Sequence, residues 1–201
     1  VFRQMVPEVD GVAVLGIGES IDGLVADLQD ATFQAQTTFV YYKDGKQQLG
    51  TYYEDQNRES IPLAEMPQTM QDAVVAAENQ TFWTDKGIDP KGILRAAFSN
   101  AAGNDRQGAS TITQQYVKNY FLTSDRSLTR KLKEIVISVK IDQQQSKDQI
   151  LENYLNTIYY GRGAYGIQTA AETYFGVSAK DLTPAQAAVL ASSIRSPAGY
   201  D

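Results

Sequence analysis

Residues 108–119 read GASTITQQYVKN, and this stretch carries more hydrogen-bonding side chains than the start of a helix requires. Thr111 and Gln114 stand three residues apart as a capping box, in which each side chain bonds the backbone N–H of the other. This pattern predicts a helix from about residue 111 to 121. The box leaves four nearby polar side chains unexplained: Ser110, Thr113, Gln115 and Lys118.

The unexplained side chains favour a binding role. Gln115 and Lys118 are three residues apart and therefore share one face of the predicted helix. Ser110 stands beside the first-turn N–H groups, at the positive end of the helix, where an anion is stabilised. We expect this helix start to bind an anion or a sugar. The alternative is that these side chains only begin a helix.

The helical pattern continues on both sides of this stretch. Segment 68–78 has apolar residues at helical spacing, namely Met70, Ala73, Val74 and Ala77. Asp89-Pro90 and Thr183-Pro184 each predict an N-cap followed by proline at the first helical position. Most of the chain after residue 67 is therefore predicted to be helical.

A different pattern precedes the helices. TTFVYY at 37–42 is β-branched and aromatic, KDGK at 43–46 is a turn signal, and QQLGTYY at 47–53 follows it. These features predict a β-hairpin. The predicted fold is mainly α, with an N-terminal linker and hairpin segment at 1–60 and a helical domain at 61–201.

The composition narrows the possible chemistry. The 201 residues include no His and no Cys, which excludes disulfides and the commonest general base and zinc ligands. Acid–base chemistry must come from Asp, Glu, Lys or Tyr. Residues 91–147 carry 10 Lys and Arg against 4 Asp and Glu, whereas residues 1–90 carry 5 against 15. This basic middle suggests an anionic partner. Nucleic acid would fit the charge alone, but the sequence contains no known nucleic-acid-binding pattern, and a phosphorylated small molecule or lipid fits equally well.

The segment SLTRKLKEIVISVK adds charged residues to the basic region. Arg130 and Lys131 stand four and three residues before Glu134, so the three share a helix face. We expect this face to point away from a buried apolar stripe that consists of Leu128, Leu132, Ile135 and Val139. The simplest interpretation is a solvated face with a weak surface ion pair.

Glu78 is the other acidic residue of interest. It ends the Ala- and Val-rich segment 68–78 and precedes Phe82 and Trp83. A carboxylate beside aromatic and small apolar residues is suited to acid or base catalysis. The alternative is a glutamate at a helix end that faces water.

Taken together, these stretches resemble the family 51 glycosyltransferase domain, the peptidoglycan polymerase module of class A penicillin-binding proteins and of monofunctional transglycosylases. The first family motif matches ENQTFWTDKG at 78–87, and the second matches GASTITQQYVKN at 108–119. The third is RKLKE at 130–134, and a fourth region matches YLNTIYYGRGAYGI at 154–167. The resemblance covers roughly residues 60–200 and implies a lysozyme-like helical fold.

The first motif departs from the family pattern at three positions. The family has Asp where this chain has Asn79, His where it has Asp85, and often a basic residue where it has Thr81. These changes lead us to expect either less positive charge at the end of the first helix or different hydrogen bonding around the motif. The glutamate of the motif is retained as Glu78.

The resemblance implies an enzyme that polymerises lipid II into β-1,4-linked glycan strands, with inversion at the anomeric carbon and release of undecaprenyl diphosphate. It implies that Glu78 is the general base and that Glu134 is a second catalytic residue near the diphosphate. The implied substrate-binding residues are Ser110, Thr111, Gln114, Gln115, Lys118, Asn119, Arg130, Lys131 and Arg95.

The resemblance also implies the setting of the reaction. The expected partners are lipid II, the growing glycan strand and the membrane interface, but no nucleic acid, and a C-terminal transpeptidase domain is expected in the full-length protein. We expect the protein to lie at the extracytoplasmic face of a bacterial cell membrane, held by an N-terminal anchor that precedes Val1. No cofactor is expected to be obligatory, although Glu134 could help to hold Mg²⁺ or Mn²⁺ at the diphosphate.

Two other functions remain open. A lysozyme-like enzyme that cleaves glycans would also use carboxylates on a helical domain, but its leaving group does not require a cationic cluster. An inactive module that binds lipid II would have no need for Glu78 and Glu134. A subset of apolar residues near the motifs is expected to form an exposed patch at the bilayer interface, drawn from Ile93, Leu94, Phe98, Tyr120 and Phe121.

Overall fold

The computed structural model describes residues 38–41, 48–52, 57–101, 110–120 and 128–200. The helices are α2 (Gln68–Glu78), α3 (Pro90–Ala101), α4 (Ile112–Tyr120), α5 (Leu128–Gln144), α6 (Lys147–Thr157), α7 (Ile167–Phe175) and α8 (Pro184–Ser193). The short elements are β3 (Asn57–Arg58), η2 (Leu63–Glu65), β4 (Ala164–Tyr165), η3 (Ala179–Asp181) and η4 (Pro197–Tyr200). The prediction of a mainly α fold is confirmed.

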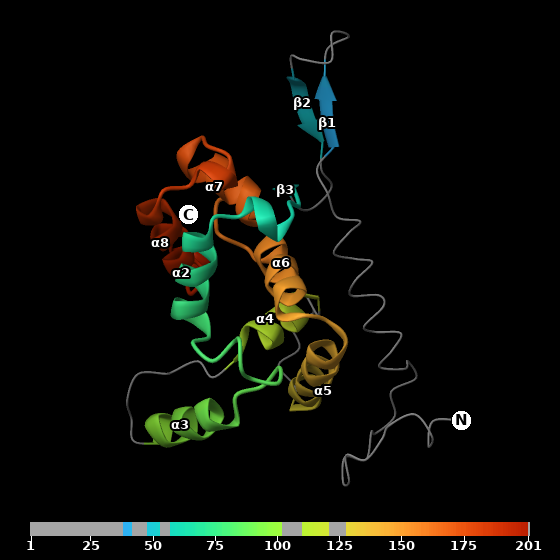
Figure 1. The fold of residues 1–201 in the computed structure, drawn as a ribbon, viewed down its shortest axis with the longest axis vertical. Coiled ribbons are helices and arrows are strands. Elements are labelled where there is room, and N and C mark those ends of the chain that lie inside the picture. Colours follow the sequence, from blue (N-terminus) through green and yellow to red (C-terminus); the bar gives the residue numbers. More distant parts are fainter. Residues whose placement is uncertain (1–37, 42–47, 53–56, 102–109, 121–127, 201) are drawn as a thin grey trace, which may run out of the picture.

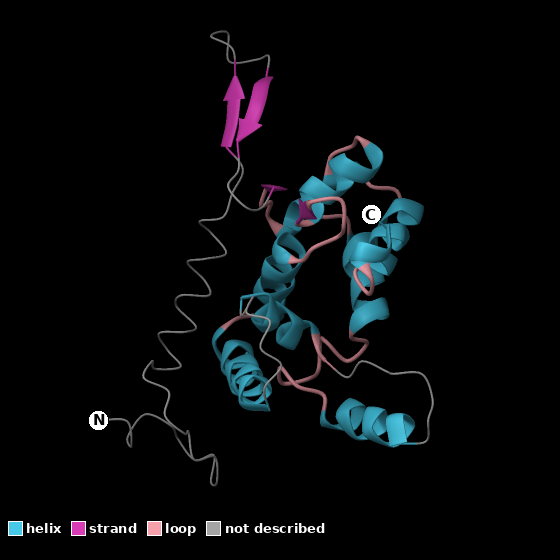
Figure 2. Ribbon diagram, turned by 180° about the vertical axis from the view of Figure 1, so that it is seen from behind, coloured by secondary structure: helices cyan, strands magenta, loops and turns pink. Residues whose placement is uncertain are grey.

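The predicted N-terminal hairpin is also confirmed. Strand β1 (Thr38–Tyr41) pairs antiparallel with β2 (Gln48–Tyr52), and Thr38 lies opposite Tyr52. Figures 1 and 2 show this ribbon projecting away from the helices. Nearer the helices, β3 pairs in parallel with β4, so the chain around residue 57 is joined to the segment before α7. The proposed domain boundary at residue 60 stays a prediction.

The core lies where the helices meet. Helix α2 packs against α8, and α4 packs against both α5 and α6 (Figure 1). The largest fully buried side chains include Phe82, Tyr116, Tyr154, Ile150 and Leu155. Burying a large apolar side chain stabilises a fold by about 1.5–3 kcal/mol. None of the described helices has the length and apolar character needed to cross a bilayer.

The local signals for helix ends are confirmed. The Asp89 side chain accepts a hydrogen bond from the backbone N–H of Gly92 at 2.9 Å, and α3 begins at Pro90. Thr183 forms a reciprocal capping box at the start of α8. Helix α7 ends at Gly176, whose φ of 66° lies in the left-handed region that glycine adopts readily.

The predicted buried face of α5 is wrong. Leu132 is 58% exposed, whereas Glu134 is 1% exposed and Ile137 and Ile141 are buried. Helix α5 carries apolar residues on more than one face, so their spacing alone did not identify the side that packs. Contact with α4 and α6 decides it, because the side turned to them is the one that contains Glu134.

Gly87 gives a first testable prediction, because both its backbone angle and its surroundings require glycine. Its φ is 80°, and a Cβ added there would lie 2.4 Å from the backbone oxygen of Ser138 in α5. Gly176 also has a positive φ, but nothing lies within 4 Å of an added Cβ. Alanine at either position costs about 1–2 kcal/mol for the left-handed backbone. We expect Gly87→Ala to destabilise the fold clearly more than Gly176→Ala.

Chemical denaturation of the two variants and the wild-type chain would measure the difference in the free energy of unfolding. Gly176→Ala is the matched control for the backbone contribution. Equal losses in both variants would contradict a close approach of Gly87 to α5.

Candidate active site

A cleft of about 510 Å³ lies at the C-terminal end of α2. Its walls come from the end of α2, the loop that follows, the first turns of α3, the start of α4 and the residue after Ile194. The lining side chains that can bond or titrate are Glu78, Asn79, Gln80, Thr81, Asp89, Arg95, Ser110, Thr111, Gln115 and Arg195. Two predicted motifs therefore meet in one cavity, although they are separated in sequence.

Glu78 is half-buried at the end of α2, where it lines the cleft. The side-chain Nε2 of Gln115 donates a hydrogen bond to Glu78 Oε2 at 2.8 Å. The hydroxyl of Tyr154, in α6, donates to Gln115 Oε1 at 2.9 Å. The predicted catalytic carboxylate is thus held by an amide from α4, which is in turn held by a phenol from the core.

Tyr154 remains protonated in this environment. Its side chain is fully buried, and burial raises its pKa well above the ordinary value of a tyrosine. The negative charge of Glu78 and the neighbouring Tyr160 act in the same direction. Tyr154 is therefore a neutral hydrogen-bond donor throughout the physiological pH range.

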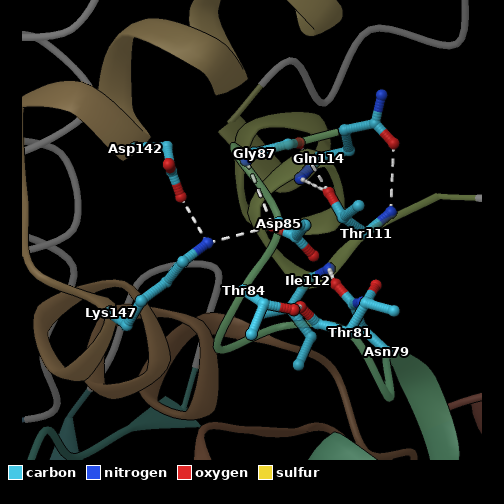
Figure 3. Close-up of polar contacts among 10 residues, drawn as sticks. All are labelled: Asn79, Thr81, Thr84, Asp85, Gly87, Thr111, Ile112, Gln114, Asp142 and Lys147. Carbon is cyan, nitrogen blue, oxygen red and sulfur yellow. Dashed lines mark hydrogen bonds and ion pairs between the residues drawn. The ribbon is translucent and has the colours of Figure 1, made fainter. Parts of the chain in front are cut away.

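The start of α4 forms the predicted capping box. Thr111 N–H donates to Gln114 Oε1 at 3.0 Å, and Gln114 N–H donates to Thr111 Oγ1 at 3.1 Å. Ile112 N–H donates to Asn79 Oδ1 at 3.0 Å. The expectation that the first-turn N–H groups are open to an anion is wrong for residues 112 and 114, because side chains already occupy them. Figure 3 shows these contacts.

Asn79 fits its position by using both ends of its amide. Its Oδ1 accepts from α4, while its Nδ2 donates to Thr81 Oγ1 at 3.0 Å. A carboxylate has no donor, so it could make the first contact, but the second would require the Thr81 hydroxyl to donate instead of accept. The expected difference from the family in hydrogen bonding at this position stays a prediction.

Asp85 lies in a buried charge cluster at the far end of the same loop (Figure 3). Lys147, at the start of α6, contacts Asp85 Oδ1 at 2.9 Å and also pairs with Asp142 of α5. The Lys147 ammonium lies 4.9 Å from the centre of the Phe82 ring, and the side chains of both aspartates are at least 95% buried. The loop is therefore attached to two helices by charge, and also to α4, because Thr111 Oγ1 donates to the carbonyl of Gly87 at 2.7 Å.

Glu134 is surrounded by cations rather than by solvent. Arg130 Nε lies 3.1 Å from Glu134 Oε1, and Lys131 Nζ lies 3.1 Å from Oε2. Lys131 also donates to Ser110 Oγ at 3.3 Å, and Ser110 lines the cleft. The interpretation of this group as a solvated surface pair is wrong, because the carboxylate is buried. Glu134 fixes the positions of two cations, one of which reaches the edge of the cleft.

The described residues do not fit a metal held by the protein. Both oxygens of Glu134 already face cations. Within the described ranges, no three His, Cys, Asp or Glu side chains are grouped closely enough to ligate a metal ion. The donors that this part of the chain provides are amides, hydroxyls and cations.

The structure brings together most, but not all, of the predicted site residues. Those that line the cleft are Glu78, Arg95, Ser110, Thr111 and Gln115, and Lys131 joins them through Ser110. Five others do not line it: Glu134 and Gln114 are buried, Arg130 and Asn119 are partly exposed, and Lys118 is exposed. Their roles in binding or catalysis stay predictions.

Sequence reasoning missed two residues at or behind the cleft. Tyr154 begins the fourth region of resemblance, but no role was predicted for it. A tyrosine among core residues is the signal that could have found it, because a buried hydroxyl needs a partner. Arg195 lines the cleft beyond the end of α8. No local pattern points to Arg195, because only the packing of α8 on α2 places it there.

Comparison with known proteins identifies the family. A family model described as transglycosylase matches residues 45–201. Penicillin-binding protein 1A of Neisseria flavescens is 47% identical over 163 residues, which cover 81% of this chain and 20% of that protein. Penicillin-binding protein 2D of Bacillus subtilis (strain 168) is 45% identical over 166 residues, which cover 82% of this chain and 24% of that protein. The chain spans about a fifth to a quarter of the length of these curated relatives. With most of its residues matched by the family model, the chain belongs to the transglycosylase family.

Proposed function

We propose that this chain is a peptidoglycan glycosyltransferase that polymerises lipid II into β-1,4-linked glycan strands and releases undecaprenyl diphosphate. The observation that carries the proposal is a half-buried carboxylate, Glu78, in a cleft that also contains Arg95 and a serine bonded to Lys131. A base and cations at one cavity are what transfer from a sugar diphosphate requires. The family match and the names of the relatives support the same reaction.

In the proposed reaction, Glu78 accepts the proton of the 4-hydroxyl group of the acceptor sugar. The hydroxyl oxygen attacks the anomeric carbon of the donor from the face opposite the diphosphate, which inverts that centre. The bond between the anomeric carbon and the diphosphate oxygen breaks, and the diphosphate leaves with the electron pair. Lys131 and Arg95 stabilise the negative charge that grows there.

Glu134 has a supporting role in this proposal. Because it is buried between Arg130 and Lys131, it fixes their positions without reaching the substrate itself. A lysine held by a carboxylate is pre-organised for a diphosphate, so less side-chain freedom is lost when the substrate binds. Ser110 would bond sugar or phosphate oxygens at the cleft, and Gln115 would do so through the N–H of its amide that does not bond Glu78.

The proposal extends to the setting of the whole protein. We place the reaction at the extracytoplasmic face of a bacterial membrane, with an anchor before this chain and a transpeptidase domain after it. Ile93 and Leu94 of α3 are 42% and 59% exposed, which supports contact with lipid near the cleft. Phe98 and Tyr120 fall where side chains are not described, and Phe121 lies outside the described residues.

Labelled lipid II, supplied to the full chain with and without EDTA, tests the proposal when the products are separated by length. We expect polymers in both arms, because the described residues do not provide a metal site. Loss of polymer with EDTA would establish that the reaction requires a divalent cation. A parallel arm supplies polymeric peptidoglycan. Shortened strands there would establish the glycan-cleaving alternative, and binding of lipid II without any product would establish an inactive binding module.

A further inference from the structure

A chain of two hydrogen bonds leads from the core to the catalytic carboxylate. Tyr154 OH donates to Gln115 Oε1 at 2.9 Å, and Gln115 Nε2 donates to Glu78 Oε2 at 2.8 Å. Tyr154 is fully buried and does not line the cleft, whereas Gln115 and Glu78 do. The tyrosine therefore reaches the site only through the amide.

The chemistry of the three groups fixes the direction of both bonds. An ionised carboxylate only accepts hydrogen bonds, so Gln115 must present its NH₂ end to Glu78. Its carbonyl oxygen then faces Tyr154, which must donate. Burial keeps the pKa of Tyr154 high, so this donor is not lost in the working pH range. The hydroxyl dipole of Tyr154 and the amide dipole of Gln115 are both aligned toward Glu78, and hydrogen bonds aligned in this way strengthen one another.

The opposite orientation of the amide would disturb the carboxylate. If the Gln115 amide turned by 180° about the Cγ–Cδ bond, its carbonyl oxygen would face Glu78 Oε2, and two acceptors would repel each other. Tyr154 opposes this rotation because it satisfies the carbonyl oxygen in the observed orientation. Among the described residues, Glu78 Oε1 has no hydrogen-bond partner, so this oxygen is available to a hydroxyl group of the acceptor.

We propose that Tyr154 is a positioning residue for Glu78. It holds the Gln115 amide so that one oxygen of the Glu78 carboxylate is fixed. The other oxygen is then free to take the proton from the hydroxyl group of the acceptor sugar. This inference rests on the proposed function for its kinetic consequence. The anchor is rigid, because α6 begins with a reciprocal capping box at Ser146 and packs on α4. The hydroxyl of Tyr154 is therefore positioned by a helix of the core rather than by a loop.

The kinetic test compares two Tyr→Phe variants. Tyr154→Phe removes the hydroxyl that bonds Gln115. Tyr160→Phe is the matched control, because Tyr160 is equally buried and its hydroxyl has no hydrogen-bond partner among the described residues. For Tyr154→Phe we expect kcat to fall about five- to tenfold, the effect of one lost hydrogen bond, with KM nearly unchanged. Tyr160→Phe should keep both constants. Equal kinetics in the two variants would overturn the proposal.

A second background tests the route through the amide. In Gln115→Leu, the connection is already broken, so adding Tyr154→Phe should change kcat little further. If Tyr154→Phe lowers kcat by the same factor in both backgrounds, it acts by another route and the proposal fails. Thermal unfolding of each variant confirms that the kinetic comparison is made between folded proteins.

A spectroscopic readout separates this inference from the proposed function. The side-chain NH₂ group of Gln115 gives two amide proton resonances, identified by their loss in Gln115→Leu. In the wild type and in Tyr160→Phe we expect two well-separated signals, since one proton is bonded to Glu78. In Tyr154→Phe they should broaden or converge as the amide rotates. Unchanged signals would overturn the inference even if the chain polymerises lipid II. The expected change would support it even if the chain does not.

Discussion

Glu78→Gln should abolish polymerisation of lipid II while leaving the fold and substrate binding nearly intact. Glutamine has the shape of glutamate, and its carbonyl oxygen can still accept the hydrogen bond from Gln115 Nε2, which is 2.8 Å long in the wild type. It cannot take a proton from the acceptor hydroxyl. Loss of a general base lowers a rate by about 10²–10⁴-fold. Without another group to take over this role, we expect the rate to fall by about 10⁴-fold or more.

Single-turnover assays with labelled lipid II would measure the chemical step, and equilibrium binding of the same substrate would be measured separately. Glu65→Gln is the matched control, because Glu65 is exposed on η2 and lies outside the cleft. It should keep the wild-type rate. If Glu78→Gln polymerises lipid II at the wild-type rate, Glu78 is not the base. If the variant no longer binds lipid II, Glu78 instead has a role in holding the substrate.

Lys147→Met should have the largest effect on stability. The lysine lies between Asp85 and Asp142, whose side chains are 4% and 5% exposed, so its removal leaves two buried carboxylates without their cation. Breaking a buried ion pair at one partner costs about 3–5 kcal/mol. Methionine keeps an unbranched apolar side chain against Phe82, which confines the change mainly to the charge.

Urea denaturation of Lys147→Met would measure the loss in the free energy of unfolding. The exposed Lys180 of η3 provides the control Lys180→Met, which should stay within about 0.5 kcal/mol of the wild type. The triple variant with Lys147→Met, Asp85→Asn and Asp142→Asn should regain most of the lost stability, because a neutral cluster leaves no uncompensated charge. A loss below about 1 kcal/mol in Lys147→Met would show that the cluster is not a structural anchor.

Two of the three departures in the first motif acquire a physical explanation from these contacts. Asp85 stands where the motif of the family has a histidine, and it is paired with Lys147. Asn79 stands where that family has an aspartate, and it links the end of α2 to the start of α4. Both residues hold the loop that follows Glu78. In this chain these two residues therefore stabilise the loop beside the site, while Glu78 is retained as the proposed base.

Some features of the site could be predicted from neighbouring residues alone. The capping box of Thr111 and Gln114 and the pairing of Lys131 with Glu134 join residues three positions apart. The sequence also indicated that Glu78 ends a helix. Such contacts depend only on the pitch of a helix and on its unsatisfied terminal groups, which are the same in every protein.

Local patterns in the sequence were thus enough to predict where several helices begin or end and which side chains share a helical turn. Three features depend on packing between segments that are distant in the sequence: the burial of Glu134 with Leu132 exposed, the pairing of Lys147 with Asp85, and the hydrogen bond from Tyr154 to Gln115. The reason is physical: a helix with apolar residues on several faces buries the face that its neighbours cover, and hydrogen bonds between distant segments form only after those neighbours are in place.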